Sequence, residues 1–161
     1  MRITSTSPEM TRELAGDLAR RLRAGDLVAL SGPLGAGKTC FVQGLAQGLG
    51  IEQVVASPSF VLAKHYPGSP GLLHIDAYRL SSVEEFWDLG LQEQLETSVG
   101  AVEWAENVAA ALPAERLDVA LSDGGDDIRI MDLQGRGRRL GEIVDGSERE
   151  LSVRSRAETS G

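Results

Sequence analysis

The eight residues from Gly32 to Thr39 constrain this chain more than any other segment. They read Gly-Pro-Leu-Gly-Ala-Gly-Lys-Thr and match every position of the phosphate-binding pattern G-x-x-x-x-G-K-[ST]. An apolar run at 27–30 precedes them, and residues 38–49 are predicted to form a helix. A strand, a loop and a helix in this order are the context in which such a loop binds phosphate. We therefore expect the chain to bind a nucleotide here.

The residue types in this loop each suit contact with phosphate. Its glycines allow a tight turn that brings backbone N–H groups close to the phosphate oxygens. The following helix presents its positive N-terminal end to the same anion. Lys38 is expected to reach the β- and γ-phosphates, and the Thr39 hydroxyl to ligate Mg²⁺. The nucleotide contacts expected from this segment are Gly32, Leu34, Gly35, Ala36, Gly37, Lys38, Thr39 and Cys40.

Length and composition indicate a cytoplasmic protein. The 161 residues suit one domain with a hydrophobic core. No apolar run approaches the ~20 residues of a membrane span, and Met1–Ser5 lacks the apolar stretch of a secretory signal. The single cysteine, Cys40, excludes an internal disulfide and favours a reducing compartment. We interpret Cys40 as a small helix residue and not a nucleophile, because no histidine lies near it in sequence.

The charge distribution argues against direct binding of nucleic acid. The formal net charge is −8, and residues 81–161 carry eighteen acidic and eight basic residues. Nucleic acid needs its phosphates neutralised, so a chain this acidic is a poor stand-alone partner for it. Most of these charges are expected to form a solvated surface.

The order of elements predicts an α/β fold of the P-loop NTPase kind. We expect a mainly parallel sheet with flanking helices, and an antiparallel hairpin formed by 60–63 and 72–76 across the turn at 66–71. Residues 1–134 are expected to be a single domain, and 135–161 a disordered tail. The other expected strands are 27–30, 54–56, 100–103, 117–121 and 128–133, and the other expected helices lie between 7 and 25 and at 82–90, 91–97 and 104–112.

Two carboxylates are placed to act beside the loop. Asp76 ends the apolar run at 72–76 as a Walker-B aspartate ends its strand, and Glu103 ends the run at 100–103 in the same way. Ligands of such sheets bind beyond the carboxyl ends of the strands, so both carboxylates are expected near the phosphates. A helix cap or a solvated strand end is the alternative for each. His74 shares a strand face with Asp76, either as a hydrogen-bond partner or as a packed core histidine.

Four motifs together resemble the TsaE (YjeE) family, the ATPases of the bacterial tRNA threonylcarbamoyladenosine pathway. The resemblance covers about residues 8 to 133, and the combination is far more specific than the phosphate loop alone. In order along the chain, the motifs are Gly32–Thr39, Ser57-Pro58-Ser59-Phe60, His74-Ile75-Asp76-Ala77-Tyr78-Arg79 and Val102-Glu103-Trp104.

The resemblance implies roles for individual residues. ATP and Mg²⁺ would be the cofactors, with Thr39 and Glu103 as the metal ligands. Asp76 would occupy the Walker-B place and support hydrolysis together with Lys38 and Glu103. Residues 57–60 would form a switch-like loop near the γ-phosphate, in which Ser59 stands where the family usually has threonine and keeps the hydroxyl.

The implied function is weak ATP hydrolysis that a partner pair stimulates. That pair would resemble TsaB and TsaD, which attach a threonylcarbamoyl group to adenosine 37 of tRNA, so tRNA contact would be indirect. A small-molecule P-loop kinase is one alternative, but residues 81–118 hold nine acidic residues and one arginine and offer no evident arginine-rich lid. A nucleotide-dependent binding module without significant turnover is the other, and Asp76 and Glu103 weigh against it.

Overall fold

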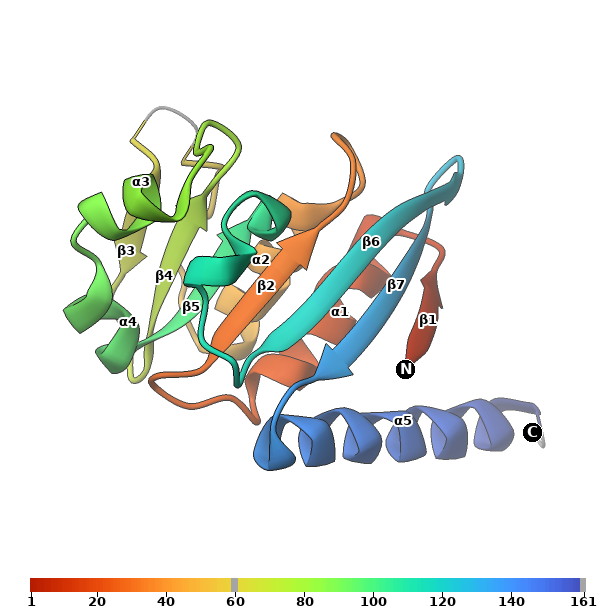
Figure 1. The fold of residues 1–161 in the computed structure, drawn as a ribbon. Helices are drawn as coiled ribbons and strands as arrows, with labels where there is room; N and C mark the ends of the chain where they lie inside the picture. Colours follow the sequence, from red (N-terminus) through yellow and green to blue (C-terminus); the bar gives the residue numbers. More distant parts are fainter. Residues whose placement is uncertain (59–60, 160–161) are drawn as a thin grey trace.

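One seven-stranded sheet with helices on both faces forms the molecule (Figure 1). This computed structural model describes residues 1–58 and 61–159. The strand order is β1-β7-β6-β2-β5-β4-β3. The strands are β1 (Arg2–Ser5), β2 (Leu27–Ser31), β3 (Ala63–Tyr66), β4 (Gly71–Asp76), β5 (Ser98–Glu103), β6 (Leu117–Gly125) and β7 (Ile128–Gly135). The helices are α1 (Pro8–Ala19), α2 (Lys38–Gly48), α3 (Val83–Asp88), α4 (Gln92–Thr97) and α5 (Arg138–Thr159), with 3-10 turns η1 (Ala105–Asn107) and η2 (Ala109–Ala111).

The predicted fold class is confirmed. Strands β6, β2, β5 and β4 are parallel to their neighbours in the centre of the sheet. Strands β3 and β4 form the predicted antiparallel hairpin, although its first strand lies at 63–66 and not at the expected 60–63. The other edge is also antiparallel, through β6–β7 and β7–β1. Every residue of β4 and β5 is buried, as expected for strands covered on both faces.

Hydrophobic cores lie on both faces of the sheet. On one face, Leu18 of α1 and Leu45 of α2 pack against the strands. On the other, Phe86 of α3 and Val108 beside η2 close the core. Helices α1 and α2 pack closely, because a Cβ atom at Gly44 would lie 2.5 Å from the carbonyl oxygen of Arg12. The phosphate-loop helix is therefore fixed against its neighbour.

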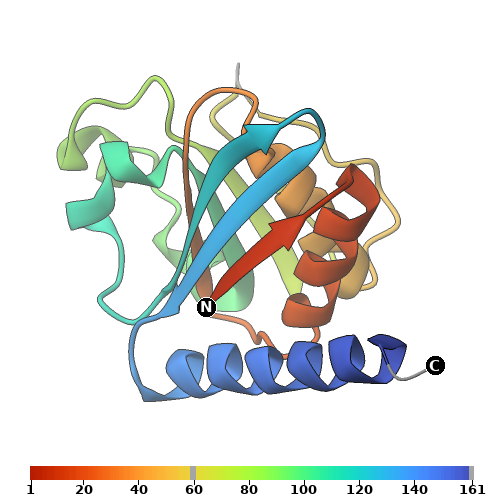
Figure 2. The same ribbon diagram turned by 90° about the vertical axis from the view of Figure 1, so that its right-hand side faces the viewer.

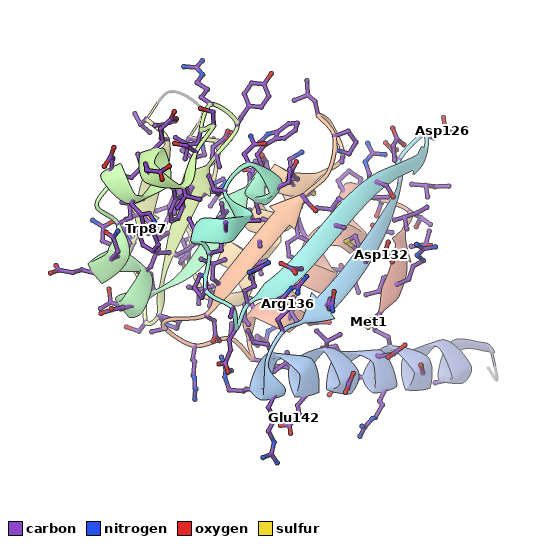
Figure 3. All side chains as sticks on the ribbon, in the orientation of Figure 1. Met1, Trp87, Asp126, Asp132, Arg136 and Glu142 are labelled. Atoms are coloured by element: carbon purple, nitrogen blue, oxygen red, sulfur yellow. The ribbon has the colours of Figure 1, made fainter. Side chains whose placement is uncertain are left out.

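Three other local expectations differ from the structure. Residues 54–56 form no strand, and β1, which the sequence did not predict, adds to the edge through pairs such as Ile3 with Met131 (Figure 3 labels the nearby Met1 and Asp132). The helix expected at 104–112 is replaced by two 3-10 turns. Trp104 starts the first of them with a φ of 57°, a left-handed conformation that an α-helix cannot contain.

The structure describes regular elements as far as residue 159 in the segment 135–161, which the sequence predicted to be a disordered tail; residues 160–161 lie outside the described residues. Strand β7 continues to Gly135, and α5 begins at Arg138 and lies across the end of the sheet opposite the phosphate loop (Figures 1 and 2). Leu140 and Val144 are buried in the main core. This short apolar stripe lies in a polar, arginine-rich segment whose composition led to the prediction of disorder. Among the described residues, no helix combines the length and hydropathy needed to cross a membrane.

Candidate functional site

The phosphate loop joins the carboxyl end of β2 to the start of α2. Its backbone passes so close to β6 that a Cβ atom at Gly32 would lie 2.3 Å from the carbonyl oxygen of Leu121. The φ of Gly32 is also 136°, which side chains disfavour, so this position requires glycine. Ala36 is buried beneath the loop, whereas Leu34 projects from its tip.

A cavity of about 540 Å³ lies beside this loop, at the carboxyl ends of β2, β4 and β5. It brings together the loop, Asp76 and Glu103, which are far apart in sequence. Of the other expected contacts, Gly32 and Ala36 lie in the loop behind the lining, and Ser59 lies outside the described residues. The lining residues are Leu34, Gly35, Gly37, Lys38, Thr39, Cys40, Ser57, Asp76, Tyr78, Arg79, Glu103 and Trp104.

Strand register brings the two carboxylates side by side. Strand β5 lies between β2 and β4, and Asp76 is paired directly with Glu103. Glu103 is only 4% exposed, and its oxygens accept hydrogen bonds from the Thr39 hydroxyl at 2.9 and 3.1 Å. His74 lies within hydrogen-bond distance of the same carboxylate through Nε2. The sequence prediction of two strand-end carboxylates therefore corresponds to adjacent groups.

Thr39 and Glu103 together suit Mg²⁺. Their hydroxyl and carboxylate oxygens are hard donors, and Mg²⁺ commonly takes one or two protein groups and completes its shell with phosphate oxygens and water. Within the described part of the chain, no cluster of three or more His, Cys, Asp or Glu side chains forms a metal site. The donor set thus fits a metal that arrives with a nucleotide.

Asp76 connects the sheet to two loops. Its Oδ2 accepts a hydrogen bond from the Ser57 hydroxyl at 2.9 Å, and its Oδ1 accepts one from the Tyr78 backbone N–H at 2.9 Å. Ser57 starts the segment that the sequence resemblance described as switch-like. A change at the Asp76 carboxylate would therefore be felt in both loops.

Lys38 is folded back onto its own loop. Its ammonium group donates hydrogen bonds to the carbonyl oxygens of Gly32 at 2.6 Å and Pro33 at 2.8 Å. It also lies 4.0 Å from the centroid of the Trp104 ring, a cation–π arrangement. Burial lowers the pKa of Lys38, and the nearby carboxylates of Glu103, Glu106 and Asp76 act in the opposite direction. A phosphate in the cavity would offer the ammonium group charged partners in place of carbonyl oxygens.

An aromatic pair and an asparagine, which the sequence did not assign to the site, support the cavity wall. Tyr78 and Trp104 lie with ring centroids 4.9 Å apart. The Asn107 side chain donates to the backbone carbonyls of Ala77 at 3.0 Å and Tyr78 at 3.3 Å. Tyr78 and Trp104 stand beside motif residues, which was the available signal for them. Asn107 had no sequence signal, because its role depends on the left-handed turn at Trp104.

Cys40 has the environment of a structural thiol. Its Sγ atom lies 3.4 Å from the carbonyl oxygen of Pro8 and 3.6 Å from the Arg12 guanidinium. Burial raises the pKa of the Cys40 thiol, and Arg12 only partly opposes this shift. A raised pKa reduces the thiolate fraction, which a nucleophile would need.

Comparison with known proteins gives consistent matches. The family model described as "Threonylcarbamoyl adenosine biosynthesis protein TsaE" matches residues 5–131. The protein named tRNA threonylcarbamoyladenosine biosynthesis protein TsaE from Streptomyces coelicolor is 47% identical over 136 residues, covering 80% of this chain and 92% of the relative. Its namesake from Treponema pallidum is 43% identical over 134 residues, covering 81% and 99%. The crystal structure of YdiB from Bacillus subtilis superposes with a TM-score of 0.80 at 35% identity, covering 93% of this chain and 95% of YdiB.

Proposed function

Because this chain belongs to the TsaE family, we propose that it binds and slowly hydrolyses ATP with Mg²⁺ in support of threonylcarbamoyladenosine formation in tRNA. The names of its relatives support the pathway. The observation that carries the ATPase proposal is the contact between Thr39 and Glu103 at the end of an intact phosphate loop. A loop that served only as a turn would not need a buried carboxylate aimed at its threonine.

In this proposal the loop and Lys38 bind the phosphates. Backbone N–H groups of the loop and the first turn of α2 surround the β- and γ-phosphates. Lys38 exchanges the carbonyl oxygens of Gly32 and Pro33 for phosphate oxygens. Thr39 and Glu103 hold Mg²⁺, which neutralises phosphate charge when bound.

Asp76 positions the attacking water and links it to the loops. A carboxylate at this place can accept a proton or a hydrogen bond from water. Because Ser57 and the Tyr78 backbone bond to the same carboxylate, the geometry around the γ-phosphate is transmitted to both loops. A partner that reads these loops would therefore sense whether ATP or ADP is bound.

We expect the protein alone to hydrolyse ATP slowly and partners to stimulate it, because negative charge on the γ-phosphate must be stabilised in the transition state. Arg79 is the one arginine in the cavity lining, beside Lys38, among the residues that the structure describes. An additional cation, or ordering of residues 57–60 by a TsaB–TsaD-like pair, would stabilise the γ-phosphate charge and raise turnover by ~10³-fold or more. The net charge of −8 favours indirect contact with tRNA, through these partners.

The test measures phosphate release and ATP binding separately. Steady-state phosphate release is followed for the protein alone, with each partner-like protein and with both, beside calorimetric ATP binding in Mg²⁺ and in EDTA. We expect tight Mg²⁺-dependent binding, slow release alone and stimulation by the pair. Binding without phosphate release under any condition would favour a binding module. ADP release that requires a small-molecule acceptor would favour a kinase.

A further inference from the structure

We propose that His74 is a positioning residue that holds the Glu103 carboxylate in the orientation that binds Mg²⁺. This inference rests on the proposed function and adds a residue to it. His74 is 0% exposed and lies in the middle of β4, and its Nε2 atom makes a hydrogen bond with Oε2 of Glu103. It does not line the cavity, so it acts on a bound nucleotide only through Glu103.

Glu103 needs a second donor because its carboxylate is buried and can rotate. The terminal torsion of a glutamate has broad preferences, so packing alone does not fix the direction of its oxygens. Thr39 bonds to both oxygens, but its hydroxyl is also the expected second metal ligand and would reorient when Mg²⁺ binds. His74 is bonded to Oε2 only, so it keeps its contact while Thr39 reorients.

The strand register leaves space for this contact. His74 is paired across the sheet with Ala101, and Glu103 is the next residue of β5 on the same face. Ala101 has no side chain beyond Cβ, so the imidazole can extend along the strand toward Glu103. A large side chain at position 101 would occupy that path.

The second ring nitrogen argues against a packing role for His74. Nδ1 is buried and has no hydrogen-bond partner in the described part of the chain. An ionised carboxylate only accepts hydrogen bonds, so Nε2 donates, and Nδ1 is left without a partner whether it would accept or donate. A leucine would fill this space without burying an unpaired nitrogen. The hydrogen bond to Glu103 is therefore the feature that distinguishes histidine from an apolar residue here.

The first experiment separates metal-dependent from metal-independent binding. Affinity for a non-hydrolysable ATP analogue is measured with Mg²⁺ and with EDTA for the parent, His74→Leu and His74→Gln. Removing a residue that hydrogen-bonds to a metal ligand typically lowers metal affinity ~10–100-fold. We expect His74→Leu to lose that much with Mg²⁺ and little with EDTA. His74→Gln should recover most of the loss, because its amide nitrogen lies near the place of Nε2. His65→Gln is the control, since His65 contacts Ser98 and not the site.

The second experiment measures the parent protein and does not depend on any substitution at His74. The chain contains two histidines, and the His65→Gln variant assigns their ¹⁵N ring signals. We expect His74 to carry its proton on Nε2 and its signals to shift when Mg²⁺ joins the bound analogue. An Nε2 atom without a proton would overturn the proposal, as would His74→Leu binding with the parent's Mg²⁺ dependence or with equal losses in Mg²⁺ and EDTA. If the parent protein bound the ATP analogue equally well with and without Mg²⁺, the proposed function would be contradicted instead.

Discussion

The two ends of the sheet both contain charged side chains that are held by other groups of the protein, but the kind of partner differs between the ends. At the α5 end, two ion pairs join α5 to the rest of the fold: Arg139 pairs with Asp26, and Arg21 pairs with Glu150 at 2.5 Å. Figure 3 labels Arg136 and Glu142 at this same end, where α5 begins. These pairs connect α5 to the loop before β2 and to the end of α1.

At the cavity end, several of the hydrogen bonds described for the charged groups involve hydroxyl or backbone groups, and His74 is a further partner of Glu103. Glu103 is bonded to the Thr39 hydroxyl, and Lys38 to backbone carbonyls. Asp76 accepts from a hydroxyl and a backbone N–H. Neutral donors keep a buried charge solvated without cancelling it, so its field remains available to a ligand. The comparison therefore separates side chains that form ion pairs between α5 and the rest of the fold from charged side chains whose described hydrogen bonds go mostly to hydroxyl and backbone groups.

The largest expected effect is on hydrolysis by Asp76→Asn. The amide keeps the size of the carboxylate and one acceptor oxygen, but it loses the charge that positions water. A role of this kind is worth ~10²–10⁴ in turnover, and we expect ATP affinity and melting temperature to change little. Turnover, affinity and melting temperature are measured together. The matched control is Asp26→Asn at the α5 end, which should lower the melting temperature and leave turnover intact. The comparison would be contradicted if Asp76→Asn lowered the melting temperature and kept its turnover while Asp26→Asn lost turnover.

Lys38→Ala should have the next largest effect. Losing the ammonium group removes a cation from the phosphates, and a charged donor to a developing negative charge is typically worth ~10²–10³ in rate. The fold should tolerate the change, since the hydrogen bonds described for the lysine go to carbonyls of its own loop and its other described contact is with the Trp104 ring. Phosphate release and ATP affinity are compared with the thermal unfolding of the same sample. Parent-like binding and turnover would remove Lys38 from the site.

The sequence predicted which residues lie together at the cavity end, because their positions are set by one continuous loop and by strand ends. The phosphate loop is one continuous segment, and its strand and helix follow directly. Asp76 and Glu103 could be placed together because carboxyl ends of parallel strands meet at one edge of a sheet. The partnership of His74 with Glu103 stayed open, since it depends on which strands are neighbours and on the small residue at Ala101.

The sequence predicted the α5 end poorly because its stability comes from contacts distant in sequence. Arg139 and Asp26 are 113 residues apart, so no window of sequence contains the pair. The apolar stripe at Leu140 and Val144 covers a single stretch of a long polar helix, too short to outweigh the composition. Strand β1 is similar, because four residues become a strand only when β7 is there to pair with them.

Leu140→Ala should lower stability and leave nucleotide binding unchanged, which is the opposite of the pattern expected for substitutions at the cavity end. Leu140 is buried against the core, and truncating such a side chain typically costs 2–5 kcal/mol of unfolding free energy. Nucleotide affinity of the folded fraction should be unchanged, because α5 lies at the far end of the sheet (Figure 1). Urea unfolding and calorimetry on the same preparations measure both quantities. Glu142→Ala, at an exposed position of the same helix, is the control and should change neither. An equal effect of both substitutions on stability would mean that α5 does not pack through Leu140.

The smallest expected effect is that of the ion pair between Arg139 and Asp26. The Arg139 side chain is 32% exposed and that of Asp26 is 10%, so the pair is only partly screened by water. Asp26 also accepts a hydrogen bond from the Arg23 backbone N–H at 2.7 Å, which would keep it partly satisfied without the arginine. We therefore expect a coupling of about 1 kcal/mol, near the upper end for exposed pairs.

A double-mutant cycle measures this coupling. The free energy of unfolding is determined for the parent, Arg139→Ala, Asp26→Asn and the double variant, because the cycle isolates the pair from the separate cost of each truncation. Arg138→Ala is the control, since its side chain is 93% exposed and pairs only with Glu142 of the same helix among the ion pairs described. High salt should reduce the Arg139 coupling without abolishing it. A coupling of zero would mean that charge pairing does not stabilise this end of the sheet, and packing of α5 alone would then distinguish it from the cavity.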